Sequence, residues 1–314
     1  MADLQAVQLP SLVLGSNTFT EDWYPTVVSY RLSQAPSSAV AALVNGAYLA
    51  GASTAITGTA ADYSGSGLRK VEVGITPGGG VTTWYPATGT AAWSYSWTLP
   101  ADGIYTLRSR ATDTNNAVET PGAGITVTVD NTPPTLTWGA PASPPNRSGW
   151  YNTNVSLPFT PADNLAGVAS TAPASPLVIA AEGSAVNGAV TVTDRAGNAA
   201  TFTSPAYKID KTAPTLTALA NPPGAKLNKN KVYANVNVTG TETDGLSGVD
   251  MAPGSGSYAI AGTDIAGTFS ISTTGSYNFK LSLPTWVART FTITVRARDR
   301  AGNTGTRNIP FVVK

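Results

Sequence analysis

Two phrases recur along this chain, and they constrain its fold more than any other feature. Residues 194–198 and 299–303 both read Asp-Arg-Ala-Gly-Asn. Residues 130–135 (Asp-Asn-Thr-Pro-Pro-Thr) and 210–215 (Asp-Lys-Thr-Ala-Pro-Thr) form a second, looser pair. Self-similarity at long spacing indicates one structural unit that is copied along the chain. The sequence therefore predicts an array of similar modules rather than one large domain.

A run of alternating apolar residues precedes each Asp-Arg-Ala-Gly-Asn phrase. Residues 291–297 are apolar at every second position, and residues 105–111 and 186–192 follow a similar pattern. Period two with one apolar face indicates a half-buried strand. No window of a dozen residues combines a helical period with capping residues. Many short strands, with turns every 8 to 12 residues, predict an all-β fold of tandem β-sandwiches.

A weaker copy of the boundary phrase stands at residues 24–29, and it sets the predicted start of the first module. Aligning Pro25, Pro134 and Pro214 divides the chain into an N-terminal arm and three modules, with bounds 1–24, 25–131, 132–211 and 212–314. Proline fixes φ and favours an extended predecessor, so the linkers should hold the modules in a semi-rigid string. The strand-like arm is predicted either to extend the sheet of module 1 or to add to a neighbour's sheet edge.

Composition excludes several classes of chemistry. The 314 residues include no cysteine and no histidine, which removes thiol catalysis, disulfides, zinc fingers and Ser-His-Asp triads. No run of about 18 apolar residues exists, so we expect no membrane span. The first residues lack the basic and apolar regions of a secretory signal. We expect either a signal removed from a longer protein or another route out of the cell, as in a virion.

Charge is distributed unevenly along the chain. The net charge is −4 over residues 1–130, −1 over 131–210 and +6 over 211–314, with a total of +1. An acidic front and a basic rear favour head-to-tail association with other subunits, or an anionic partner at the rear. Solvated surface with chance drift between modules is the simpler alternative.

Several strings resemble the bacterial immunoglobulin-like (Big-type) repeats. They are residues 99–107, residues 209–215 and the two Asp-Arg-Ala-Gly-Asn phrases, and the resemblance covers about residues 36–314. It implies immunoglobulin-like β-sandwiches of the kind found in surface adhesins, secreted proteins and phage structural proteins. It also implies adhesion, spacing or assembly as the role, and it names no ligand.

Aspartates in repeat-related turns are the candidate metal ligands. Ca²⁺ takes six to eight oxygen ligands, and the resemblance to adhesin repeats implies that it binds near module junctions. The spacing matches no EF-hand loop, and the alternative is that each aspartate only caps its own turn. The candidates are Asp62, Asp113 and Asp130 in module 1, Asp163, Asp194 and Asp210 in module 2, and Asp244, Asp250 and Asp299 in module 3. No cofactor is required, and Ca²⁺ is the one candidate.

Two further groups of side chains are candidate binding residues. Trp93, Tyr95 and Trp97 alternate along one strand, so they form either a platform for sugar rings or the core face of module 1. Arg296, Arg298 and Arg300 alternate in module 3 and could contact phosphate or an acidic glycan. Because no exposed aromatics are interleaved with these arginines, a solvated strand face is favoured and nucleic acid is not expected.

These patterns favour a non-enzymatic protein. Paired carboxylates in glycosidases face each other across one cleft, whereas these acids recur in every module, which suits a structural task. We expect an extracellular structural or adhesive protein that acts as a spacer, fibre or surface-binding element of a bacterium. The alternatives are a tailed-phage virion component and a carbohydrate-binding accessory module. Expected partners are other protein subunits and a cell-surface glycan.

Overall fold

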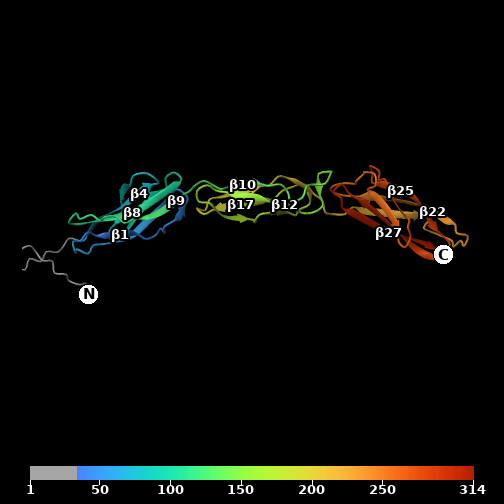
Figure 1. Cartoon of the computed structure of the whole chain (residues 1–314), viewed down its shortest axis with the longest axis horizontal. Coiled ribbons are helices and arrows are strands. Elements are labelled where there is room, and N and C mark those ends of the chain that lie inside the picture. The colour runs from blue at the N-terminus through green and yellow to red at the C-terminus, as the bar shows by residue number, and fades with distance from the viewer. Residues whose placement is uncertain (1–33) are drawn as a thin grey trace, which may run out of the picture.

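A computed structural model describes residues 34–314, so the predicted arm (1–24) and the start of module 1 at Pro25 lie outside the described residues. Three β-sandwich modules lie end to end in an elongated, gently bent rod (Figure 1). The described residues form strands, turns and loops and contain no helix, which confirms the all-β prediction. Accordingly, residues 34–314 include no helix long and apolar enough to cross a membrane.

Module 1 packs a four-stranded sheet, in the order β1-β3-β7-β6, against a five-stranded sheet, β2-β9-β8-β4-β5. Its core contains Ile56, Val73, Leu107 and Val127 among its fully buried residues. The strands are β1 (Ser37–Val40), β2 (Ala47–Leu49), β3 (Ser53–Ala61), β4 (Leu68–Pro77), β5 (Thr83–Pro86), β6 (Thr88–Gly89), β7 (Ala92–Thr98), β8 (Gly103–Asp113) and β9 (Ile125–Val129).

Module 2 has shorter strands because two positions interrupt its ladders. Pro158 has no N–H to donate and separates β12 from β13. At Gly188 the partner is the side chain of Ser204, and β16 is separated there from β17. The strands are β10 (Thr135–Trp138), β11 (Trp150–Tyr151), β12 (Val155–Leu157), β13 (Phe159–Ala162), β14 (Val168–Ala172), β15 (Leu177–Ile179), β16 (Gly183–Val186), β17 (Ala189–Asp194), β18 (Ala199–Thr203) and β19 (Tyr207–Ile209).

Module 3 packs a three-stranded sheet, β20-β22-β25, against a five-stranded sheet, β21-β27-β26-β23-β24. Its core is rich in aromatic residues and includes Phe291 and Phe311, which are both fully buried. The strands are β20 (Thr215–Asn221), β21 (Gly224–Ala225), β22 (Tyr233–Thr243), β23 (Gly256–Ile260), β24 (Ala266–Phe269), β25 (Ser276–Pro284), β26 (Arg289–Arg298) and β27 (Thr304–Val313).

All three modules begin and end in the same way. The first strand pairs antiparallel in one sheet, in the pairs β1–β3, β10–β13 and β20–β22. The chain then crosses to the other sheet, where a short strand runs parallel to the last strand of the module, in the pairs β2–β9, β11–β19 and β21–β27. This parallel closure positions the residue that follows the last strand, and in modules 1 and 2 that residue begins the connection to the next module.

Candidate functional site at the module junctions

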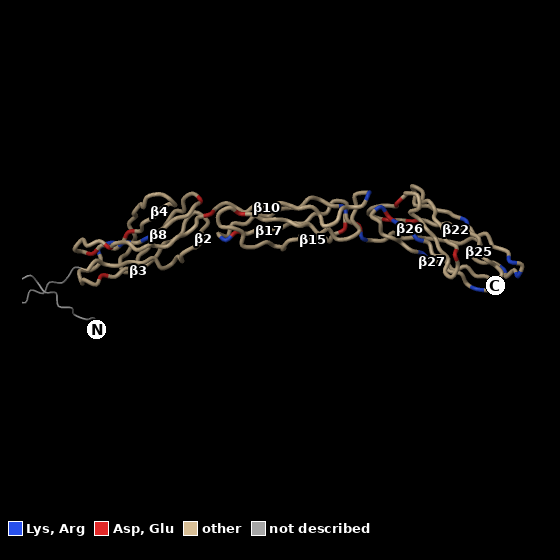
Figure 2. The backbone as a smooth tube through the Cα atoms, viewed as in Figure 1, with Lys and Arg blue, Asp and Glu red and all other residues tan. Residues whose placement is uncertain are grey.

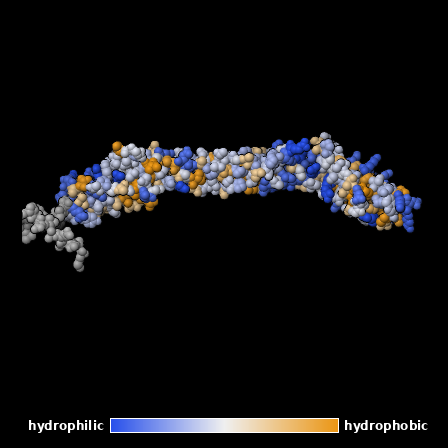
Figure 3. All heavy atoms as spheres, viewed as in Figure 1, coloured by the Kyte–Doolittle hydropathy of each residue, from blue (hydrophilic) through white to orange (hydrophobic). Residues whose placement is uncertain are grey.

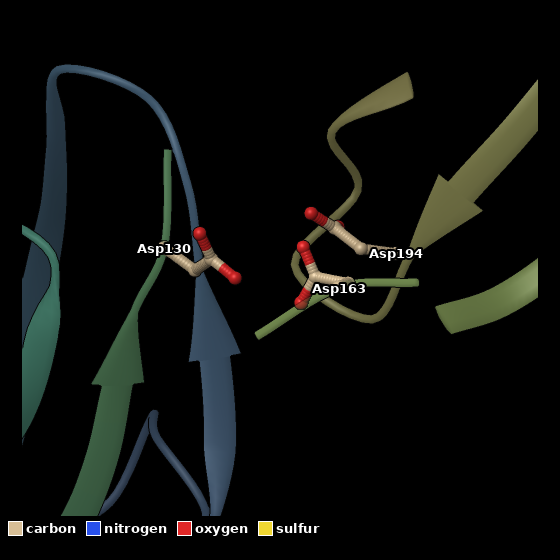
Figure 4. A group of neighbouring side chains, drawn as sticks. All are labelled: Asp130, Asp163 and Asp194. Atoms are coloured by element: carbon tan, nitrogen blue, oxygen red, sulfur yellow. The ribbon is translucent and has the colours of Figure 1, made fainter. Parts of the chain in front are cut away.

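Each junction is built from three short segments that the sequence repeats. We call them the linker (residues 130–134 and 210–214), the early turn (163–167 and 244–248) and the late turn (194–198 and 299–303). The linker leaves one module, and both turns belong to the next one. Figure 4 shows one aspartate from each segment at the first junction. Phrases that are far apart in sequence are therefore in contact.

The early turn folds around its first aspartate. Asp163 Oδ1 accepts hydrogen bonds from the backbone N–H groups of Leu165 (3.2 Å) and Gly167 (2.6 Å). Gly167 has φ +74°, a left-handed conformation that glycine adopts readily. A short acidic side chain that bonds to nearby backbone, followed by a glycine, is a locally encoded turn.

The late turn folds around an Asp-Asn pair. Asp194 Oδ1 accepts a hydrogen bond from the backbone N–H of Asn198, and Oδ2 accepts one from its side-chain Nδ2, both at 2.8 Å. The backbone N–H of Arg195 donates to the carbonyl of Gly167 at 3.0 Å and joins the two turns. The early and late turns therefore form one surface at the end of module 2 that faces module 1, which we call its upper end.

The linker is hydrogen-bonded to both turns across the first junction. Asp130 Oδ2 accepts from the backbone N–H of Ala166, and Asn198 Nδ2 donates to the carbonyl oxygen of Asp130, both at 2.8 Å. Asp130 Oδ1 accepts from the N–H of Thr132 at 3.0 Å, within the linker itself. The last residue of one module is thus bound by its own linker and by the next module.

The second junction repeats the same hydrogen bonds. Asp210 Oδ2 accepts from the N–H of Ser247 at 3.0 Å, and Asn303 Nδ2 donates to the carbonyl oxygen of Asp210 at 2.8 Å. Asn146, from a loop of module 2, adds a bond from its Nδ2 to the carbonyl oxygen of Arg300 at 2.8 Å. Recurrence of the same bonds at both junctions indicates one repeated way of joining modules.

A second carboxylate, contributed by the preceding module, accepts hydrogen bonds from each linker. Asp102 accepts from the N–H of Asn131 (2.8 Å) and from the hydroxyl of Thr132 (2.6 Å). Glu182 accepts in the same way from the N–H of Lys211 (3.1 Å) and the hydroxyl of Thr212 (2.9 Å). With its first residues bound on both sides, each linker has little freedom to bend.

Each junction also brings three carboxylates together. Oxygens of Asp130, Asp163 and Asp194 lie within 4.8 Å of one another, and the same holds for Asp210, Asp244 and Asp299. Four of these side chains, all except Asp163 and Asp244, are at most 2% exposed. The ion pairs of the described residues join Glu72 to Lys70 and Arg110, so no Lys or Arg is paired with either group.

Three close carboxylates repel one another, and burial strengthens the repulsion. Burial raises the pKa of Asp299 above its ordinary value, and the nearby charge of Asp210 raises it further, against hydrogen bonds that lower it. Clustered carboxylate oxygens are the ligands that Ca²⁺ prefers. The residues therefore fit a hard divalent cation at each junction.

The remaining candidate aspartates lie elsewhere. Asp62 and Asp113, in the corresponding turns of module 1, are bridged by the hydroxyl of Ser66, at 3.2 Å and 2.9 Å. No third carboxylate joins them among residues 34–314. Asp250 belongs to neither group, and its Oδ1 accepts a bond from the N–H of Ala252 at 3.0 Å. Within the described chain, six of the nine candidates therefore form three-carboxylate groups.

The aromatic row of module 1 is not an exposed platform. Trp93 and Trp97 are buried at 2% and 4% exposure, and Tyr95 packs beside the core. Trp97 meets Tyr105 edge to face at 5.5 Å, and Tyr95 stacks on Tyr85 at 5.4 Å. These rings face inward because a sandwich core needs large side chains at alternate positions of each strand. The structure therefore places the candidate sugar platform in the core.

The three arginines of module 3 are all exposed, at the end of β26 and in the late turn. Arg296 and Arg298 lie opposite Thr306 and Thr304 on β27, so their strand face is polar. Arg300 takes part in the second junction through its backbone carbonyl, which accepts the bond from Asn146. The structure thus separates this row into two solvated residues and one junction residue.

Sequence inspection missed the residues that join the modules. Asn198 and Asn303 stand in the repeated phrase, but their side chains were not candidates, nor were the linker-holding carboxylates Asp102 and Glu182. The signal was present, because Asn ends both copies of the phrase, whereas Ala117 stands at that place in module 1. The side-chain amide of asparagine can donate a hydrogen bond to the preceding module, whereas alanine has no polar side-chain atom.

Comparisons with known proteins give similarity of fold only. No protein-family model matches the sequence, and no curated protein matches it. Among solved structures, fibronectin(III)-like modules of Clostridium thermocellum CbhA are 13% identical, with 88% of this chain and 94% of that chain covered at a TM-score of 0.24. A tetra-tandem repeat from the extending region of a large adhesion protein is 19% identical, with 89% and 74% covered at 0.27. Domains A168–A170 of titin are 11% identical, with 89% and 99% covered at 0.26.

At these identities and scores the neighbours carry no information about ligand or role, and the class of the protein follows from its own topology. Modules 1 and 3 each pack two sheets face to face, and module 2 divides its strands among four shorter sheets. In every module a short early strand pairs parallel to the last strand, while the other strand pairs are antiparallel. The chain is a tandem immunoglobulin-like repeat protein with closely similar module junctions.

Proposed function

We propose that this protein is a non-enzymatic spacer that holds its two ends apart outside a bacterial cell, as part of a surface adhesin or fibre. One observation carries the proposal: the same inter-module hydrogen bonds, from Asn198 and Ala166 or from Asn303 and Ser247, recur at both junctions. A chain that only tethered its ends would have no use for such junctions. A virion component would use the same mechanics, and immunogold labelling of cells and of phage particles distinguishes the two locations.

Small-angle X-ray scattering of the purified chain tests the spacer. We expect a distance distribution typical of an extended rod, with separate maxima for modules one and two steps apart. The double variant Asn198→Ala, Asn303→Ala should smear these maxima, because both junctions lose a hydrogen bond between modules. The exposed pair Asn187→Ala, Asn278→Ala, which lies outside the linkers and both turns, is the matched control and should leave the curve unchanged. A wild-type curve of a flexible chain, with no such maxima, would refute the proposal.

We also propose that the carboxylate group at each junction binds Ca²⁺. Support comes from the close, largely buried carboxylates that have no paired cation among the described residues. A bound Ca²⁺ would neutralise their repulsion and link the linker carboxylate to both turns of the next module. The expected consequence is a stiffer rod in an environment rich in calcium.

Calorimetric titration with CaCl₂ tests the metal proposal. Two sites per chain are expected, and Asp163→Asn should remove one of them, since that aspartate supplies one of three carboxylates. Asp62→Asn is the control and should leave both sites intact, because Asp62 belongs to neither group. Free Ca²⁺ at a hundred times the dissociation constant should add about 2.7 kcal/mol of stability for each occupied site. No heat of binding, or equal loss in both variants, would contradict this proposal without affecting the spacer.

A further inference from the structure

The lower end of module 3, which is the end away from module 2, differs from the lower ends of modules 1 and 2. In module 3 the last strand is β27, and the residue that follows it is Lys314. The backbone N–H of Lys314 donates to the carbonyl oxygen of Ala225 at 3.1 Å. Asp130 and Asp210 make the equivalent bonds, at 2.9 Å, to the short parallel strands of their own modules. Lys314 is therefore equivalent in strand register to Asp130 and Asp210, so module 3 has an ammonium group where modules 1 and 2 have a carboxylate.

The carboxylate that holds the linker is also missing at this end. Asp102 and Glu182 directly precede the strands that pair with the last strands of modules 1 and 2. In module 3 the residue before β26 is Ala288. Both acidic groups that bind a linker at the two junctions are therefore replaced at this end of module 3.

Exposed apolar side chains gather there instead. The loops 226–232 and 285–288 are joined by bonds from Asn228 N to Thr285 O (2.8 Å) and from Thr285 N to Val232 O (3.0 Å). Tyr233 and Trp286 meet edge to face at 4.7 Å. Leu227, Val232, Tyr233 and Val287 are 37% to 52% exposed. We call this surface the tip.

Cationic side chains surround the apolar ones. Lys226, Lys229, Lys231, Arg289 and Lys314 are all exposed at the tip. Among side chains of residues 34–314, one carboxylate lies nearby, that of Asp264. It belongs to the loop that Arg289 contacts through the carbonyl of Ala261. Figure 2 shows the basic residues at this end of the rod, and Figure 3 shows hydrophobic residues among hydrophilic ones there.

We propose that the tip docks onto an anionic lipid bilayer, with Val287, Val232 and Leu227 entering the interface and the lysines contacting the head groups. Apolar and aromatic side chains that project among Lys and Arg suit the bilayer interface, where aromatic rings and long cationic chains sit at head-group level. Basic residues near an anionic membrane surface add attraction that depends on salt. The rod would then hold its other modules away from the membrane.

Two other occupants fit the tip less well. A sugar ring stacks on an open aromatic face, whereas Tyr233 and Trp286 are perpendicular and Trp286 is half-buried. A second copy would offer the upper end of module 1, where Asp113 is fully buried and Asp62 already accepts bonds from its own turn. Backbone N–H groups of Gly67 and Ser64 lower the pKa of Asp62 to about 2.

Co-sedimentation of the full chain with vesicles tests the tip. We expect binding to vesicles of phosphatidylcholine mixed with phosphatidylglycerol, little binding to phosphatidylcholine alone, and weaker binding as salt rises. The double variant Lys229→Gln, Lys231→Gln should bind roughly 25-fold more weakly, at about fivefold for each lysine lost near the surface. Val287→Asp should also weaken binding, because it puts a charge into the interface without disturbing the core.

The matched control is Arg296→Gln, Arg298→Gln, which removes the same charge from the other end of β26. It should leave vesicle binding within about twofold, since these arginines lie beyond the reach of screened attraction to the membrane. Equal losses in both double variants, or equal binding to both kinds of vesicle, would overturn the proposal. Self-association in analytical ultracentrifugation that the lysine variant abolishes, without vesicle binding, would assign the tip to a second copy instead.

Discussion

At the scale of single residues, the asparagine of the late turn explains why its phrase is repeated. The side-chain amide of Asn198 has two hydrogens, and one bonds to Asp194 while the other bonds to the carbonyl of Asp130 in the preceding module. Asn303 divides its hydrogens in the same way between Asp299 and Asp210. One residue therefore closes its own turn and fastens the neighbouring module.

Replacing Asn303 with alanine should lower the free energy of unfolding of module 3 by about 2 kcal/mol, because two buried acceptors lose their donor. Hydrogen exchange measured by mass spectrometry should show faster exchange in the turns of the second junction. The first junction provides an internal control in the same molecule. Unchanged exchange at Ser247, whose N–H bonds to Asp210, would contradict this role.

Glu242 is a buried carboxylate, 1% exposed, whose oxygens have no hydrogen-bond partner. Burial raises its pKa to about 7, and the charges of Asp299, Asp244 and Asp250 add to the increase. A pKa raised in the folded state means that the native protein binds the proton more tightly than the unfolded chain. The contribution of Glu242 to stability is therefore most favourable below the unfolded pKa and is lost as pH rises toward 7.

The variant Glu242→Gln should be more stable than wild type at pH 8 by roughly 3 kcal/mol and nearly equal to it at pH 4, because it carries no charge to bury. Urea unfolding at both pH values, in the presence of a calcium chelator, measures the difference. A wild-type stability that stays flat between pH 4 and 8 would show that Glu242 does not titrate as proposed.

At the scale of secondary structure, two glycines let an aromatic ring lie across a strand. In β3, a side chain on Gly58 would meet the ring of Trp93 at 2.2 Å, and in β22 one on Gly240 would meet the hydroxyl of Tyr277 at 2.4 Å. Each aromatic residue is the direct cross-strand partner of its glycine. The close approach lets the aromatic ring fill the core without separating the strands.

Gly240→Ala should therefore destabilise module 3 by about 1 to 3 kcal/mol, as overpacking does in other cores. Gly245→Ala is the matched control, because a methyl group there meets no atom within 4 Å. Thermal unfolding followed by circular dichroism compares the two. Equal melting temperatures of the two variants would mean that β22 and β25 can move apart to accommodate the methyl group without loss of stability.

At the scale of the whole molecule, rigidity depends on linkers held from both sides. Asp102 binds the first linker from module 1, and Asn198 binds it from module 2. Because the chain contains no cysteine, single cysteines can be introduced for labelling without removing native ones. The angle at one junction can then be measured in the intact rod.

With labels at Ser94 in module 1 and Thr203 in module 2, the variant Asp102→Ala should broaden the distribution of distances across the first junction. The cause is the loss of two hydrogen bonds to the linker. Single-molecule energy transfer measures the width. Glu182→Ala acts on the second junction and should leave this width unchanged, so equal widths in wild type and Asp102→Ala would count against a held linker.

Much of the fold could be predicted from the sequence. The alternation that ends at Asp113 and Asp194 appears as β8 and as the split pair β16 and β17, and the third run appears as β26. Alternation is a local property of the pleated strand, so it can be seen without any tertiary contact. The face on which Trp93 and Trp97 lie was also predictable, but not whether that face was covered.

The sequence by itself determined the number of repeated units, their β structure and the turns that each aspartate caps, because those interactions join residues a few positions apart. Only the tertiary structure decided that Asp130 belongs with Asp163 and Asp194 of the next module, and that Lys314 takes the place of such an aspartate. The physical reason is that these groups meet through the stacking of module ends and through strand register. Both bring together residues that lie far apart along the chain.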